Sequence, residues 1–202
     1  MANISTFYVS GADKYSVAIE GIGALAGITD ITGKISLAAR RAVNSTLDKT
    51  RTAAAQKIRE GVAFPANYLD PAQGRLTVSR YAQGDALEGA IGARFRATSL
   101  ARFVVGNPKR GAKGGGVQVM VKPGQVRTVA GGFMIGLKSG NQGLAVRSNG
   151  PPPRAWKPKP LGDGLWLLFG PSVNQAFGEV REDIAPAAAV NLELEFNRQM
   201  DL

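Results

Sequence analysis

The chain of 202 residues contains no cysteine and no histidine. Without cysteine there can be no disulfide, no thiolate nucleophile and no thiolate metal site. Without histidine the chain lacks the commonest metal ligand and the usual acid–base group near neutral pH. An enzyme would have to work with carboxylates, lysine, tyrosine or serine alone. We therefore expect a protein that is not an enzyme and has neither a metal nor a cofactor.

Long apolar stretches are also missing. No run reaches the roughly 18 apolar residues that a membrane-spanning helix needs. The first residues contain neither the basic nor the apolar region of a secretory signal. The sequence thus predicts no membrane contact and synthesis in a cytoplasm. Aromatic residues make up only 7% of the chain and glycines number 26, which favours many turns over a dense aromatic core.

Acidic residues are absent between Glu88 and Asp163, a stretch with thirteen basic residues. Residues 1–88 hold ten basic and eight acidic residues, and residues 163–202 hold two and seven, so the net charge of +10 comes from the middle of the chain. A block of one sign creates a field that attracts polyanions or acidic protein surfaces. The pattern indicates a surface that meets something large and negative.

The clearest element is a helix over residues 34–60. Its apolar residues recur at spacings of four and seven, as one stripe of a 3.6-residue repeat requires: Ile35, Ala39, Val43, Leu47, Ala54 and Ile58. Gly61 follows where a left-handed cap is expected. The basic residues are expected on a solvated face with Asp48 and Glu60 as acidic partners; they are Arg40, Arg41, Lys49, Arg51, Lys57 and Arg59.

Other segments alternate or carry turn signals. Residues 5–22 predict a short hairpin, or an arm that becomes ordered only against a partner. Strands are expected over 76–81, 90–96, 117–121, 133–138, 144–147 and 165–169. Residues 98–105 fit strand or loop equally. Pro123 and Gly124 suit the centre of a type II turn. Ser172 and Gln175 have capping-box spacing for a helix to about Ile184, where Pro186 either kinks it or starts a second piece.

This order predicts an α+β fold. It consists of an N-terminal hairpin or arm over residues 1–32 and a single domain over residues 33–202. That domain has a long amphipathic helix, an antiparallel β meander and a C-terminal helix packed on the sheet.

Two loops are candidate contact sites. Residues 107–116 form a flexible basic loop with Lys109, Arg110 and Lys113, and they lack the spacing of a phosphate-binding loop. The loop either faces DNA or another subunit, or is a solvated tip with incidental charge. Residues 150–160 are rich in proline and are expected to be extended and polyproline-like. They form either an interface arm or a plain surface loop, with Trp156 as the anchor and three cations: Arg154, Lys157 and Lys159.

Carboxylates cluster at Glu179, Glu182 and Asp183, at helical spacing. Paired carboxylates can catalyse glycoside hydrolysis, but the surrounding helix is amphipathic and the cluster is expected to be exposed. We interpret it as a solvated helix face.

Several stretches together resemble a known family. They are residues 38–51, residues 162–173 and the final Glu-rich helix, supported by residues 98–103, 119–124 and 144–148. Over residues 33–200 the chain resembles the minor tail protein Z, or tail-completion, family of long-tailed bacteriophages. Residues 1–30 and the 107–116 loop do not match.

The resemblance implies a structural virion protein at the head-proximal end of the tail, assembled in the host cytoplasm. Related neck proteins form six-fold rings, so by analogy the resemblance implies a hexameric ring of this chain. Its neighbours would be neck and tail-tube or terminator proteins, with genomic DNA in the channel. The loops 107–116 and 150–160 would reach the lumen or the adjacent ring. The alternative is a nucleic-acid-binding protein that uses residues 89–162 without sequence specificity.

Overall fold

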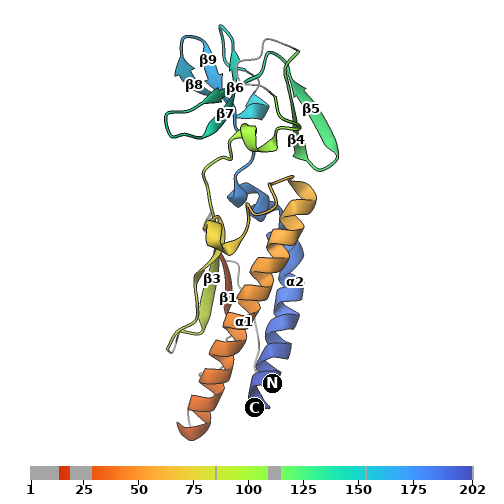
Figure 1. Cartoon of the computed structure of the whole chain (residues 1–202). Helices are drawn as coiled ribbons and strands as arrows, with labels where there is room; N and C mark the ends of the chain where they lie inside the picture. The colour runs from red at the N-terminus through yellow and green to blue at the C-terminus, as the bar shows by residue number, and fades with distance from the viewer. Residues whose placement is uncertain (1–13, 19–28, 85, 109–114, 153, 202) are drawn as a thin grey trace. The chain divides into compact units, whose positions relative to one another are not determined.

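The computed structural model describes residues 14–18, 29–84, 86–108, 115–152 and 154–201 (Figure 1). The chain divides into two compact units. The first unit comprises residues 1–58, 69–94 and 177–202, and the second comprises residues 59–68 and 95–176. The single domain over residues 33–202 that the sequence analysis expected stays a prediction. The chain passes between the units four times, and two of the boundaries between units fall within helices. These boundaries are therefore not marked by a linker-like composition.

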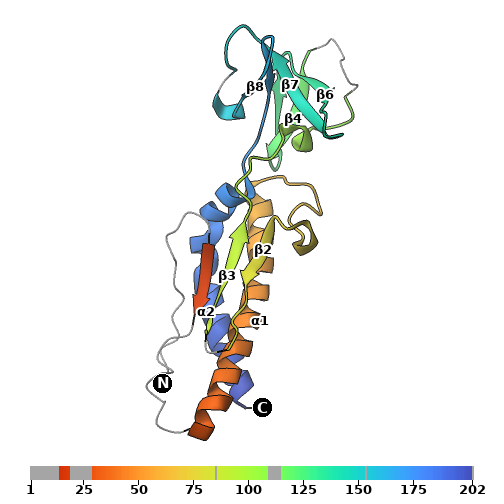
Figure 2. The same ribbon diagram turned by 90° about the vertical axis from the view of Figure 1, so that its left-hand side faces the viewer.

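The first unit combines an antiparallel sheet with helices. Its three strands are ordered β1–β3–β2, with bounds Lys14–Ala18 for β1, Leu76–Arg80 for β2 and Glu88–Ala93 for β3. Most of two long helices belongs to this unit: α1 (Thr29–Gly61) and α2 (Val173–Met200). The two helices run side by side and cover one face of the sheet (Figure 2). The predicted α+β class is confirmed.

The N-terminal hairpin prediction is only partly covered by the described residues. The first expected strand and its turn, within residues 5–13, lie outside them. The expected second strand corresponds to β1, which pairs with β3 from Lys14 opposite Gly92 to Ala18 opposite Glu88. Part of the predicted arm is therefore the edge strand of the first unit's sheet.

Helix α1 confirms the predicted apolar stripe. Every one of the six stripe residues is buried, with Ala39, Val43 and Leu47 fully inaccessible to solvent. At 33 residues the helix is about 50 Å long, from its rise of 1.5 Å per residue. The predicted left-handed cap is wrong. Gly61 belongs to the last turn and has no positive φ.

The basic face of α1 differs from the prediction in its partners. Asp48 accepts a hydrogen bond of 2.6 Å from the Tyr81 hydroxyl, which raises the pKa of Tyr81. Lys49 pairs with Glu195 of α2 across 3.2 Å. Arg51 is buried rather than solvated. The helix is thus held by polar contacts to Tyr81, which follows β2, and to α2 as well as by its apolar stripe.

Helix α2 begins with the predicted capping box. The Ser172 amide donates to Gln175 Oε1, and the Gln175 amide donates to Ser172 Oγ, each across 3.1 Å. The helix then continues through Pro186 to Met200 as one element. Of the two alternatives for Pro186, a separate second piece is wrong. Ala188 and Leu192 are buried as the predicted stripe requires.

Glu195 joins the two helices although its side chain is almost completely buried. Its Oε1 accepts hydrogen bonds from Arg198 Nε (3.1 Å) and Gln199 Nε2 (3.3 Å), while Oε2 faces Lys49 Nζ. These contacts, led by the Arg198 hydrogen bond and opposed by burial, lower the pKa of Glu195 from 4.5 to about 2. A carboxylate with a depressed pKa in the folded state stabilises the fold above its unfolded pKa.

Replacing Glu195 with glutamine should therefore give a pH-dependent loss of stability. At pH 7 we expect the free energy of unfolding to fall by about 1 kcal/mol, a value kept small because both cations are mostly exposed. The difference should shrink as the pH falls from about 4.5 to about 2, where the native carboxyl gains its proton. Urea denaturation across this range measures it. An exposed control, Glu182→Gln, should change little at any pH; an equal loss in both variants would contradict the prediction.

The second unit is built mainly of antiparallel strands. A two-stranded hairpin contains β4 (Val117–Lys122) and β5 (Gln125–Val129), and Gly124 at φ 75° completes the predicted turn between them. A four-stranded sheet has the order β6–β7–β9–β8. Its strands are β6 (Phe133–Gly136), β7 (Gln142–Arg147), β8 (Lys159–Gly162) and β9 (Leu165–Leu167). The predicted hairpin over 133–147 corresponds to β6 and β7.

The core of the second unit lies around a short 3₁₀ turn, Leu100–Phe103, in the segment that fitted strand or loop equally. The ring centroids of Phe103 and Phe64 are 5.6 Å apart. The Phe64 ring in turn stacks on the Tyr68 ring, with a centroid distance of 5.1 Å. The Tyr68 hydroxyl is 3.1 Å from Thr98 Oγ1, so its polar end is satisfied inside the core. This packing fixes the segment 62–68 against the strands.

Candidate functional site

The charge of the chain is divided unequally between the two units. The second unit holds thirteen basic residues and two acidic ones, a net charge of +11. The first unit holds twelve basic and thirteen acidic residues, a net charge of −1. The folding of the chain therefore collects twelve of the thirteen cations of the positive block into one compact body, and Arg94 alone belongs to the first unit. The sequence showed the block but not that it forms a unit with its own core.

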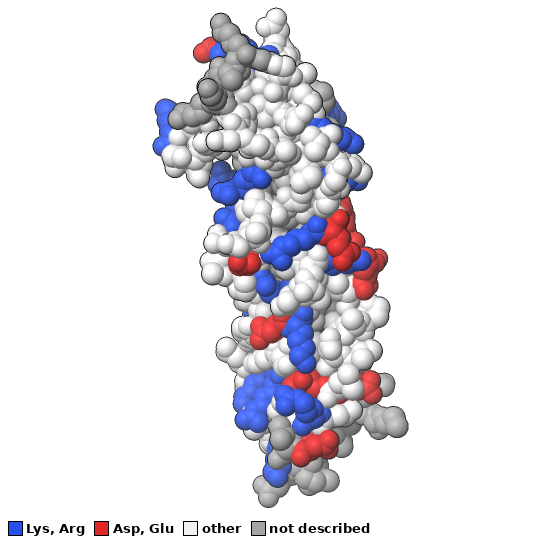
Figure 3. Space-filling model, turned by 45° about the vertical axis from the view of Figure 1, so that its right-hand side comes forward, with Lys and Arg blue, Asp and Glu red and all other residues white. Residues whose placement is uncertain are grey.

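Among the described residues of this unit, nine cations are exposed: Arg96, Arg102, Lys122, Arg127, Lys138, Arg147, Arg154, Lys157 and Lys159. None of them forms an ion pair with a carboxylate in the part of the chain that the structure describes. In the upper part of Figure 3, basic side chains are spread among neutral ones, whereas near the lower end several lie close together. This arrangement suits contact with an extended anionic surface more than with a small anion.

The predicted loop cations have different outcomes. Lys109, Arg110 and Lys113 lie outside the described residues. Arg154, Lys157 and Lys159 are exposed, and Lys157 Nζ donates to Gln175 Oε1 at the start of α2.

The segment 150–160 is not a polyproline arm over its length. Arg154–Trp156 form a 3₁₀ turn, closed by the Lys157 amide, which donates to the Arg154 carbonyl across 2.9 Å. Lys157 then takes a φ of 42°, and Lys159 begins β8. The extended prediction is wrong at residues 154–156, where the chain turns, whereas residues from Lys159 onward are extended and pair with β9. The Phe169 amide also donates to the Trp156 carbonyl across 2.8 Å, which holds the turn on the framework.

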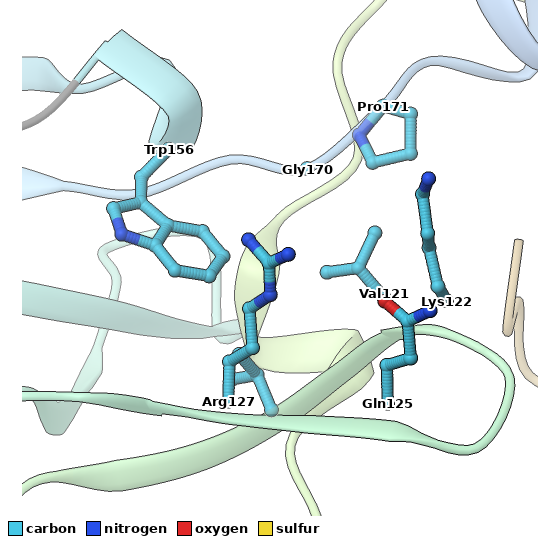
Figure 4. A pocket seen from close by; sticks show the side chains of 8 residues that line it. Val121, Lys122, Gln125, Arg127, Trp156, Gly170 and Pro171 are labelled. Carbon is cyan, nitrogen blue, oxygen red and sulfur yellow. The ribbon is translucent and has the colours of Figure 1, made fainter.

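Trp156 lines a pocket of about 150 Å³ beside the β4–β5 hairpin (Figure 4). We call it the β4–β5 pocket, and its residues are Val119, Val121, Lys122, Gln125, Arg127, Trp156, Gly170 and Pro171. In Figure 4 the guanidinium of Arg127 rises from β5 beside the Trp156 ring.

The pocket combines an apolar lining with charged edges. Val119 is buried, and Trp156 and Val121 are half-buried, whereas Lys122 and Arg127 are exposed. Such a pocket can hold an apolar group that lies next to an anion. Sequence reasoning did not single out Lys122, Gln125 and Arg127 as site residues. The available signal was their position around the Pro123–Gly124 turn, which places all three at one end of a hairpin.

Features of catalytic or metal sites do not appear in the described part of the chain. Glu179, Glu182 and Asp183 are all exposed, as predicted for a solvated helix face. Within the described residues, no group of three or more acidic side chains is placed to hold a metal ion.

Comparisons with known proteins identify no relative: no protein-family model, no curated protein and no solved structure matches this chain. Among the described helices, none is both long and apolar enough to cross a bilayer.

Proposed function

We propose that this chain is a structural virion protein of a tailed bacteriophage that completes the tail or joins it to the head. The proposal starts from the resemblance of residues 33–200 to the minor tail protein Z family. The observation that carries it is the second unit, with a net charge of +11 and nine exposed cations. A protein at the end of the tail meets packaged DNA and neighbouring subunits, and this surface is suited to both.

In this proposal the chain acts as a ring subunit, one of six by analogy with neck proteins. A ring repeats the same interface around its axis, so each copy needs two different complementary surfaces. Repetition would also multiply the charge of the second unit into a positive collar. The partners would be further copies of the chain, neck and tail-tube or terminator proteins, and genomic DNA.

Electron microscopy of lysates from a phage that lacks this protein tests the proposal. We expect filled heads beside separate tails of normal length, because completion and joining follow tail assembly. Complementation with the wild-type chain should restore joined particles. Intact, infectious particles without the protein would reject the proposed role.

A second candidate is a nucleic-acid-binding protein without sequence specificity. It is favoured by the absence, within the described residues, of carboxylate partners for the nine exposed cations. Binding to a duplex oligonucleotide should then weaken linearly in a plot of log affinity against log salt, with a slope of about −0.9 per phosphate contacted. Fluorescence anisotropy from 50 to 200 mM salt, on duplexes of unrelated sequence, measures this. Absence of binding at 50 mM salt would exclude it.

A further inference from the structure

Helix α2 exposes an apolar stripe. Val190 and Leu194 are 57% and 62% exposed although both are large aliphatic residues. Ala187 and Asp183 continue the row at helical spacing, and both are exposed. We call these four residues the α2 stripe. The opposite side of the helix, with Ala188 and Leu192, is buried. Leu194 is therefore not a core residue, and its position next to Val190 suggests a contact with another molecule.

The stripe is apolar and acidic together. Glu193 lies next to Leu194, and Asp183 begins the row. Both carboxylates are exposed, and neither forms an ion pair with a cation in the described parts of the chain. Glu195, by contrast, is buried and already held by Lys49 and Arg198. A partner for this surface must supply an apolar recess and positive charge.

The β4–β5 pocket has these two properties. Its volume of about 150 Å³ is comparable with cavities that accept a benzene-sized group, so it can take one aliphatic side chain. Lys122 and Arg127 carry its positive charge. A phosphate backbone would satisfy the two cations but not the apolar lining of Val119 and Val121. The α2 stripe satisfies both.

We propose that the α2 stripe of one copy docks into the β4–β5 pocket of a second copy, with Leu194 in the pocket and Glu193 beside Lys122 and Arg127. The two surfaces differ, so the contact is head-to-tail: the first copy keeps its pocket free and the second keeps its stripe free. Repetition of such a contact closes into a ring when the rotation permits. The inference rests on the proposed ring subunit and specifies the surfaces that would join neighbouring copies.

Disulfide cross-linking tests the contact directly, because the chain has no cysteine of its own. An equimolar mixture of the Gln125→Cys and Leu194→Cys variants should form a covalent dimer under mild oxidation. A matched control, Ser139→Cys in the exposed β6–β7 turn, should not cross-link to Leu194→Cys. A monomeric protein at all concentrations would overturn the proposal. So would a Leu194–Leu194 cross-link of equal yield, which indicates a symmetric contact instead.

Charge exchange is the second test. The double variant Lys122→Glu/Arg127→Glu should weaken self-association by at least about tenfold in analytical ultracentrifugation, because it opposes like charges. Its mixture with Glu193→Lys should recover association, whereas either variant alone should not. A duplex oligonucleotide could also occupy the pocket. If it does so in place of a second copy and blocks the 125–194 cross-link, the proposal is overturned in favour of a nucleic-acid site. No recovery in the mixture would also overturn it.

These measurements use purified protein and are independent of the virion role. If copies associate through this contact while phage without the protein form intact particles, the proposed function fails and the inference stands. If the tails are defective while the purified chain neither self-associates nor cross-links, the inference fails and the function stands.

Discussion

Replacing Arg51 with alanine is expected to lower the free energy of unfolding by about 3 kcal/mol, the value of two buried hydrogen bonds to a charged donor. Arg51 is only 9% exposed on α1. Its Nε donates to the Leu76 carbonyl across 3.0 Å, and Nη2 donates to the Leu69 carbonyl. Both acceptors belong to residues that are fully buried. Without the guanidinium, these carbonyls would lose a donor that water cannot easily replace.

Urea denaturation of the two proteins at pH 7 measures the effect as a shift of the midpoint. Arg41→Ala is the matched control, because Arg41 lies on the same helix and is exposed. Its change should stay within about 0.5 kcal/mol. The Arg51→Lys variant should fall between the two, since an ammonium cannot span both carbonyls with a planar fork. A loss below about 1 kcal/mol for Arg51→Ala would show that the two carbonyls find other donors.

A valine in place of Gly89 should be equally damaging. Gly89 lies in β3, the central strand of its sheet, and a Cβ there would lie 2.2 Å from Leu47 Cδ1 and 2.7 Å from the Arg80 carbonyl oxygen. Leu47 is fully buried and the carbonyl belongs to β2, so neither can move far. We expect a loss of about 3 kcal/mol, at the upper end of the range for overpacked cores.

Gly178→Ala is the opposite control for this prediction. Gly178 lies in α2 with no atom within 4 Å of its added Cβ, so the substitution should raise stability by up to about 1 kcal/mol. Thermal or urea denaturation of both variants compares them. If Gly89→Val kept wild-type stability, α1 and the sheet could not be packed as closely as the structure shows.

Local patterns account for the features that were predicted correctly. The spacing of Ile35, Val43 and Leu47 indicates a helix because side chains 3.6 residues apart share a face. The capping box of Ser172 and Gln175 depends on residues three apart, and it forms as predicted. The turn at Gly124 is equally local. In each case the interacting groups are within a few residues of each other, so the sequence contains the whole arrangement.

Features that depend on distant segments were predicted incompletely. The charged residues around Arg51 predict a solvated helix face. Arg51 is nevertheless buried, because residues 69–76 bring two carbonyl groups over it. In the 150–160 segment, Trp156 of the turn accepts a hydrogen bond from the Phe169 amide, and the strand that begins at Lys159 pairs with β9. Its proline content alone indicates only an extended chain. Burial and hydrogen-bond partners are supplied by other parts of the fold, which a local pattern does not contain.

By itself the sequence determined the long apolar stripe of α1, the start of α2 and the acid-free block of thirteen cations. It also excluded chemistry that needs cysteine or histidine. Only the tertiary structure decided that β1 pairs with β3 and that twelve of these cations belong to a unit of net charge +11. The β4–β5 pocket is likewise a tertiary feature, since it brings Trp156 beside Arg127. Periodicity is a property of neighbouring residues, whereas a pocket exists only where separate segments meet.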